Sequence, residues 1–250
     1  MEGKGWEAQR PAFMASREEL EGCRAVLLGA PMDWTVSFRP GSRFGPGAIR
    51  SVSDGIEEFS AYQKRSLDEV AFYDAGDLLL PFGNPKASVE IIEAAAADLL
   101  GKGYLPIILG GEHLVSLGSI RAALRRHPDL AVVHLDAHAD LRSDYFGEEH
   151  SHASVMRRVL EEFPGVAIYQ FGIRSGTADE FALAEKATHL YPFEVVEPLR
   201  AVRGSLAGRP VYLSLDIDVV DPAFAPGTGT PEPGGTPPEN SCRPSICWPA

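Results

Sequence analysis

Aspartate and histidine alternate in the stretch VVHLDAHADL, which runs from Val132 to Leu141. The stretch opens with apolar residues typical of a buried strand and then places Asp136, His138 and Asp140 at every second position. In extended chain, side chains two residues apart point the same way, so these three can converge on one point. Burying unpaired carboxylates is costly, and a metal ion facing the three side chains would remove that cost. The spacing therefore indicates a metal site.

Two other segments carry the same residue types after predicted strands. GGEH ends in His113, and DID holds Asp216 and Asp218 two positions apart. Taken alone, a D-x-D pair or a histidine after two glycines is common and is more often structural. Three such segments, each at the end of a predicted strand in one domain, are difficult to explain as core packing. We therefore expect one site built from all three.

Four aspartates and two histidines favour a pair of divalent cations. Four carboxylates gathered in one cleft repel one another, and several would be protonated at neutral pH without compensating charge. Two divalent cations supply that charge and can hold a hydroxide between them as a nucleophile. Carboxylate-rich sites with imidazole and no thiolate suit Mn²⁺, although Zn, Co or Ni could occupy such a site in vitro. The expected metal ligands are His113, Asp136, His138, Asp140, Asp216 and Asp218.

The remaining histidines are assigned by their position in the chain. His134 lies on the predicted strand itself, and we expect it to support the site or the core, because a ligand must lie nearer the strand end. His127 and His189 are expected at the surface. His150 and His152 fall in a polar loop, EEHSHAS, that runs into a helix, and one of them could reach the metal cleft.

The elements that must position these residues alternate along the chain. Apolar runs predict strands at 24–29, 70–76, 105–111, 130–136, 166–172 and 211–218. Helical patterns lie between several of them, at 86–101, 114–126 and 152–162. Strands that are apolar on both faces and alternate with helices indicate an α/β fold with a parallel sheet covered on both sides. Ligands of such folds bind at the carboxyl ends of the strands, where the three segments lie.

Composition limits the remaining possibilities. The 250 residues and 44% hydrophobic content suit one domain over 1–250 with a single sizeable core. The formal net charge of −12 argues against binding to nucleic acid and suits a cationic substrate, although acidity alone is explained equally well by solubility. Three cysteines without paired spacing suit a reducing compartment. We see no secretory signal and no run long enough to span a membrane, and expect a cytoplasmic protein.

Several motifs in combination resemble one family. GGEH, LDAHADLR, SHASVMRR and SLDIDVVDPAFAPGTGTPEPGG resemble the manganese ureohydrolases, the family of arginases and agmatinases. PMDWTVSFRPGSRFGPGAIR and FGIRSG resemble the agmatinase branch, and the resemblance runs from about Arg24 to Gly235. It implies a three-layer α/β/α sandwich around a mainly parallel sheet. It also implies hydrolysis of agmatine to putrescine and urea by a metal-bridging hydroxide, two Mn²⁺ per subunit and a homo-oligomer.

The resemblance also implies a role for each residue of the site. His113 and Asp140 would bind one Mn²⁺, whereas His138 and Asp218 would bind the other. The two ions would share the remaining ligands, Asp136 and Asp216. His152, in SHAS, matches the family's proton-shuttle histidine, and Asp140 would also orient the hydroxide.

The substrate is less defined than the chemistry. The loop at 141–151 contains Asp144, Glu148 and Glu149, which would tolerate the amine of agmatine better than a carboxylate, although at least two of them are expected to be merely solvated. Another guanidino compound, such as guanidinobutyrate or arginine, is the alternative substrate. A metal-binding protein with impaired catalysis is the alternative function.

The last residues depart from the resemblance. Residues 236–250 read TPPENSCRPSICWPA, where the family continues with a helix and a strand that supplies a guanidinium-binding glutamate. Four prolines in this tail make a regular helix improbable. The tail is hypothesised to be frame-shifted, the fold is expected to be C-terminally incomplete, and the substrate-binding residues stay unknown. The metal ligands all precede the tail, so we expect Mn²⁺ binding with poor turnover of agmatine.

Overall fold

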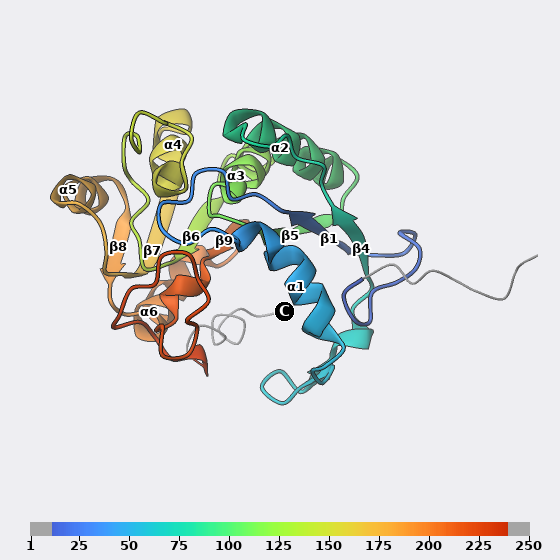
Figure 1. Cartoon of the computed structure of the whole chain (residues 1–250). Helices are drawn as coiled ribbons and strands as arrows, with labels where there is room; N and C mark the ends of the chain where they lie inside the picture. The colour runs from blue at the N-terminus through green and yellow to red at the C-terminus, as the bar shows by residue number, and fades with distance from the viewer. Residues whose placement is uncertain (1–11, 240–250) are drawn as a thin grey trace, which may run out of the picture.

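The computed structural model describes residues 12–239, and these alternate between strands and helices (Figure 1). A parallel three-stranded sheet has the order β4-β1-β5 and a parallel four-stranded sheet has the order β8-β7-β6-β9. The first sheet consists of β1 (Ala25–Ala30), β4 (Phe72–Asp77) and β5 (Leu105–Gly110). The second consists of β6 (Ala131–Leu135), β7 (Ala167–Ile173), β8 (His189–Pro192) and β9 (Val211–Leu215). A short antiparallel hairpin is made by β2 (Phe59–Ser60) and β3 (Arg65–Ser66).

Helices cover both faces of the strands. They are α1 (Gly45–Ser53), α2 (Pro85–Gly101), α3 (Val115–Arg126), α4 (Val155–Glu162), α5 (Ala178–Ala187) and α6 (Val196–Leu206). Figure 1 shows α2, α3, α4 and α5 on one side of the strands and α1 and α6 on the other. Short 3₁₀ turns are η1 (Ser42–Phe44), η2 (Leu67–Glu69), η3 (His152–Ser154) and η4 (Ile217–Val219). The predicted three-layer α/β/α arrangement with parallel strands is therefore confirmed.

Helices α2 and α3 pack closely against each other, which fixes the position of α3. A Cβ on Gly118 of α3 would lie 2.5 Å from the carbonyl oxygen of Val89 on α2, so only glycine permits this approach. Ile92 and Leu117 are fully buried between the two helices and the strands. Asn84 fixes the start of α2 by accepting a hydrogen bond from the backbone N–H of Ala87 at 3.1 Å.

The division between the sheets falls at β5 and β9, which are edges within the described residues and lie next to each other in Figure 1. On β9, Leu213 and Leu215 are 51% and 52% exposed. They pair in register with Val133 and Leu135 of β6, which are fully buried. On β5, the other edge strand, Leu105 is 62% exposed. An apolar strip of this kind on an unpaired edge favours association with another chain.

The predicted strands and helices correspond to observed elements, with two differences. The strand predicted at 211–218 ends at Leu215 and is followed by η4, whereas β8, α1, α5 and α6 were not predicted. Of the tail at 236–250, residues 240–250 lie outside the described residues, and Thr236 bridges to Val220 in parallel. No helix within residues 12–239 is long and apolar enough to cross a membrane.

Candidate metal centre

The three predicted segments meet at the carboxyl ends of β5, β6 and β9. β6 stops at Leu135 and β9 at Leu215, so each of these two strands ends one residue before its first predicted ligand. The segment after β5 is held by Gly111, whose backbone N–H donates to the carbonyl of Ala30 at 3.1 Å. A Cβ on Gly111 would lie 1.9 Å from the carbonyl oxygen of Met32, so glycine is required for this close approach.

His113 forms the first cluster with two carboxylates. Its Nδ1 lies 2.9 Å from Oδ2 of Asp136 and 2.7 Å from Oδ2 of Asp140. The nearest oxygen of Asp216 is 3.9 Å from the same nitrogen. His113 and its two close partners are at least nine-tenths buried, so water does not screen their charges.

His138 forms the second cluster. Its Nδ1 lies 2.9 Å from Oδ2 of Asp218 and 3.5 Å from Oδ1 of Asp136. Asp136 therefore presents one oxygen to each histidine. Together with the first cluster, this arrangement provides two adjacent groups of nitrogen and oxygen donors that share one carboxylate.

Backbone geometry after the strands brings these side chains together. Asp140 has a φ of 53°, the left-handed region that non-glycine residues rarely adopt, so the chain turns rather than staying extended. Asp218 accepts a hydrogen bond from the backbone N–H of Ala137 at 2.9 Å, which ties the end of β9 to the end of β6. Asp216 accepts the backbone N–H of Asp218 at 3.1 Å and lies in the same cleft, outside the two close clusters.

His134 contacts the centre from within β6. It is fully buried, and its Nε2 lies 2.8 Å from Oδ2 of Asp136. The amide nitrogen of Gln170, 3.1 Å away, donates to Nδ1, so the ring proton of His134 is on Nε2 and points at Asp136. Gln170 also donates to the carbonyl of Ala139 at 2.8 Å, which fixes the amide orientation. Such a partner orients a ligating carboxylate from behind.

The buried carboxylates of the centre carry negative charge that bound cations would neutralise. Burial raises the pKa of both Asp216 and Asp218, and the negative charge of Asp136 raises each further. Burial opposes protonation of His138, but Asp136 and Asp218 outweigh it and raise the pKa of the imidazole to about 12. Protons on the histidines thus offset the negative charge of the carboxylates. Two bound cations would offset the same charge in place of these protons. The buried Nδ1 of His113 has no hydrogen-bond partner of suitable geometry, which also fits a metal ligand.

A cavity of about 340 Å³ opens onto this centre. His138, Asp140 and His152 line it, and so do Glu232 and Arg142, which the sequence analysis did not single out. The predicted proton-shuttle histidine is therefore beside the centre. The other three histidines are elsewhere: His150 does not line the cavity, His189 is exposed as predicted, and His127 is half-buried at the end of α3.

The acidic loop residues do not line this cavity. Asp144 accepts the backbone N–H of Gly147, and Glu148 accepts that of His150. Glu149 lies 3.6 Å from Arg158. The structure therefore supports the simpler interpretation of these three as solvated charges. Besides Asp140 and the buried Glu180, the carboxylate that lines the cavity is Glu232, in the sequence PEPGG, which lies 3.7 Å from Nε2 of His138.

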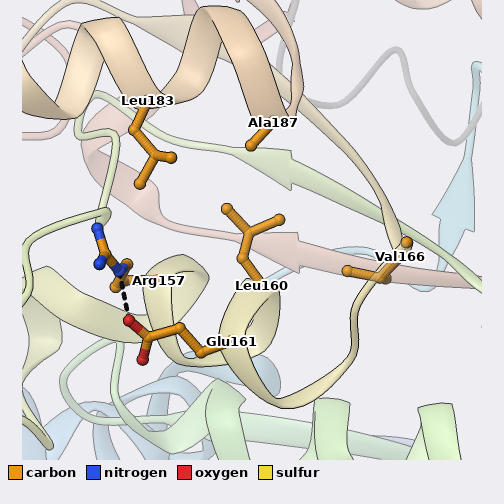
Figure 2. A pocket seen from close by; sticks show the side chains of 7 residues that line it. Arg157, Leu160, Glu161, Val166, Leu183 and Ala187 are labelled. Carbon is orange, nitrogen blue, oxygen red and sulfur yellow. Dashed lines mark hydrogen bonds and ion pairs between the residues drawn. The ribbon is translucent and has the colours of Figure 1, made fainter.

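A second cavity, of about 400 Å³, lies between α4 and α5 and is shown in Figure 2. Leu160, Leu183 and Ala187 line it, and Arg157 pairs with Glu161 at 2.6 Å at its margin. It holds no cluster of metal-ligating groups, so the chemistry belongs to the first cavity.

Residues 23–243 match the Arginase family. The chain belongs to this family. Its members are binuclear metal enzymes, in agreement with two donor clusters that share Asp136. The chain is 54% identical to agmatinase of Bacillus subtilis (strain 168) over 224 residues, which are 89% of this chain and 77% of that protein. It is 39% identical to guanidinobutyrase of Pseudomonas aeruginosa over 242 residues, 90% of this chain and 75% of that protein.

Solved structures of arginase-family proteins have the same fold. Agmatine ureohydrolase of Thermoplasma volcanium superposes with a TM-score of 0.87 at 30% identity, covering 96% of this chain and 82% of that one. Proclavaminate amidino hydrolase from Streptomyces clavuligerus superposes with a TM-score of 0.84 at 34% identity, covering 96% and 84%. This arginase-family chain is thus a metal-dependent ureohydrolase of α/β fold.

Proposed function

We propose that this chain hydrolyses agmatine to putrescine and urea with two bound Mn²⁺. The observation that carries the proposal is the position of Asp136, whose two oxygens face His113 and His138 separately. The similarity to agmatinase of Bacillus subtilis supports agmatine as the substrate. The mixture of carboxylate and imidazole donors without thiolate supports Mn²⁺.

The ligands divide between two ions. His113 and Asp140 would hold one ion, and His138 and Asp218 would hold the other. Asp136 and Asp216 would serve both. Two divalent cations bound here supply the Lewis acidity that makes water a nucleophile at neutral pH.

The remaining steps belong to the protein. Asp140 accepts a hydrogen bond from the attacking water and orients it toward the guanidinium carbon of the substrate. The water loses one proton to His152 as the new C–O bond forms, and the C–N bond to the alkyl chain then breaks in the tetrahedral intermediate. His152, in the wall of the same cavity, gives a proton to the departing amine, so that urea and protonated putrescine leave.

The proposal includes the setting of the enzyme. The net charge of −12 and Glu232 in the cavity wall suit a small cationic guanidino substrate and disfavour nucleic acid. We also propose one ureohydrolase domain over 1–250, a cytoplasmic location and a homo-oligomer. The exposed Leu213 and Leu215 support the homo-oligomer, and the lack of paired spacing among the three cysteines of the sequence supports a reducing compartment.

Urea release with added Mn²⁺ tests the proposal. The substrates are agmatine, arginine and guanidinobutyrate at equal concentrations, and the His152→Asn variant is the matched control. The proposal predicts urea from agmatine at the highest kcat/KM and little from the variant. Faster turnover of guanidinobutyrate than of agmatine would make guanidinobutyrate the substrate. Bound metal without urea from any guanidine would refute the enzymatic function.

A further inference from the structure

The loop between β1 and α1 contacts His152 through two hydroxyl groups. Thr35 Oγ1 accepts a hydrogen bond from the backbone N–H of His152 at 3.0 Å and lies 3.3 Å from Nδ1 of its ring. Ser37 Oγ lies 3.2 Å from Nε2 on the opposite side of the ring. Both ring nitrogens therefore face hydroxyls of the same loop, from a part of the chain distant from His152 in sequence. Nδ1 also lies 3.4 Å from Oγ of the adjacent Ser151.

Thr35 is itself held by the segment that carries the first metal ligand. Its backbone N–H donates to Oε2 of Glu112 at 2.9 Å, and its side chain also interacts with this carboxylate. Glu112 is 4% exposed, and its own backbone N–H donates to the carbonyl of Met32 at 2.7 Å. The loop and the GGEH segment thus hold each other in register beside His113.

One arrangement of protons satisfies all of these contacts. A hydroxyl has a single proton to donate. When Thr35 donates that proton to Glu112, its oxygen accepts from both the backbone N–H and the Nδ1–H of His152. The imidazole then carries its fixed proton on Nδ1, and Nε2 is the nitrogen that gains and loses a proton. Ser37, which is exposed in the cavity wall, connects Nε2 to solvent.

We propose that Thr35 is a positioning residue for His152, which holds the ring in the cavity and keeps its fixed proton on Nδ1, and that Ser37 links Nε2 to solvent. The part of this inference that concerns catalysis rests on the proposed function. The part that concerns the ring is a property of the protein without metal or substrate. A hydrogen-bonded partner that selects the tautomer is a common way to prepare a catalytic imidazole.

The test uses three substitutions in the full chain. Thr35→Val keeps the shape of the side chain and removes the hydroxyl, whereas Thr35→Ser keeps the hydroxyl. Ser51→Ala removes an exposed hydroxyl of α1 that bonds only within its own helix, and is the control for a lost hydroxyl elsewhere. Thermal unfolding and bound Mn²⁺ are measured for each variant, so that a folding or metal defect is recognised.

The first readout is the tautomer of His152 in the metal-free protein. Long-range ¹H–¹⁵N spectra of the imidazoles, assigned with His152→Asn, report which ring nitrogen is protonated. We expect the Nδ1–H form in the wild type and in Thr35→Ser, and its loss in Thr35→Val. An Nε2–H form in the wild type, or an unchanged spectrum in Thr35→Val, would overturn the inference whether or not the chain hydrolyses agmatine.

The second readout is the urea-release rate with agmatine. Thr35→Val should lower kcat by about 10-fold to 100-fold, part of the contribution of a general acid, with KM changed by less than about 3-fold. Thr35→Ser should stay within about 3-fold of the wild type. Equal kcat for wild type and Thr35→Val would contradict the positioning role. Absence of urea from the wild type would instead refute the proposed function and leave the tautomer result to decide.

Discussion

Nδ1 of His138 lies 2.9 Å from Oδ2 of Asp218, so the ends of β6 and β9 deliver complementary metal-binding groups to one place. Asp136 joins this pair to the cluster around His113. Metal binding by one cluster should therefore depend on the other cluster. Substitutions at the shared residue and at its neighbours should therefore have different effects.

Asp136→Asn should weaken metal binding at both positions, because the amide has no negative charge and offers one carbonyl oxygen where the carboxylate offers two. We expect the metal content to fall from two toward none and urea release to fall by about a thousandfold or more. Metal analysis after equilibrium dialysis provides the measurement. Asp98→Asn, on the exposed surface of α2, provides the control. Retention of both ions by Asp136→Asn would contradict the shared role.

His152→Asn should separate proton transfer from metal binding. The side chain lines the cavity and belongs to neither donor cluster, so metal content should not change. Loss of the general acid should lower kcat by about 10²-fold to 10⁴-fold. Steady-state kinetics with agmatine test this, with His189→Asn as the control because His189 is exposed. A variant that lost metal and activity together would assign His152 a different role.

Metal removal should destabilise the fold, because the cations bind the native state and offset its buried carboxylates. At a free Mn²⁺ concentration of 100 times its Kd, one bound ion contributes about 2.7 kcal/mol to the free energy of unfolding. Thermal unfolding with and without chelator should show this difference in the wild type. In Asp136→Asn, the difference should disappear. Equal melting temperatures for the metal-loaded and the metal-free wild type would mean that the site does not bind metal.

The Arg50–Asp74 pair should make the fold sensitive to acid. The guanidinium meets both carboxylate oxygens, at 2.7 and 2.9 Å, and both residues are less than 5% exposed. Burial opposes ionisation of Asp74, but Arg50 and backbone N–H groups outweigh it and hold its pKa below the ordinary value of 3.8. The pair therefore stabilises the fold above pH 3.8, and this stabilisation is lost as the pH falls through the lowered pKa.

Asp74→Asn should accordingly cost about 3–5 kcal/mol of unfolding free energy at pH 7, because Arg50 then loses its buried two-bond partner and keeps the more exposed Asp77 as a charged partner. Urea denaturation at pH 7 and near pH 3 measures the effect, which should shrink at the lower pH. Asp98→Asn breaks an exposed pair with Lys102 and should cost less than about 1 kcal/mol at pH 7. An equal cost for both variants at pH 7 would contradict the importance of burial.

The exposed strip on β9 should promote self-association. Leu213 and Leu215 are each about half exposed on an edge strand. Replacing both with lysine should lower the mass seen by light scattering coupled to gel filtration, without a loss of unfolding free energy beyond about 1 kcal/mol. An unchanged mass would place the interface of any oligomer elsewhere.

Much of this architecture could be predicted because it has a local signal. Strands β1 and β5 are continuous apolar runs, and β6 and β7 are apolar apart from His134 and Gln170. The residues that follow β5, β6 and β9 are polar in a way that a core does not explain. β8 was missed because its four residues, HLYP, include a histidine and a proline and are half exposed. α6 was missed although its apolar residues have helical spacing, because Pro198 in its first turn and Gly204 near its end lower its helix propensity.

The contacts behind the site had no such signal. Asp136, His138 and Asp140 were expected to converge on an extended strand, whereas the chain turns at Asp140 with a positive φ. Thr35 reaches His152 through a loop whose course depends on tertiary packing. Glu232 was part of a motif but had no pattern of its own that would place it at the cavity. Sequence patterns therefore predict the metal-ligating residues better than they predict the residues that position those ligands.

Electron paramagnetic resonance of Mn²⁺ titrated into the metal-free protein tests the shared centre most directly. Two ions that share Asp136 lie close enough for exchange coupling, so the account predicts two equivalents bound per chain with the spectrum of a coupled pair. Asp136→Asn should abolish that spectrum. A single uncoupled ion at saturation, or a coupled pair that survives in Asp136→Asn, would contradict the account.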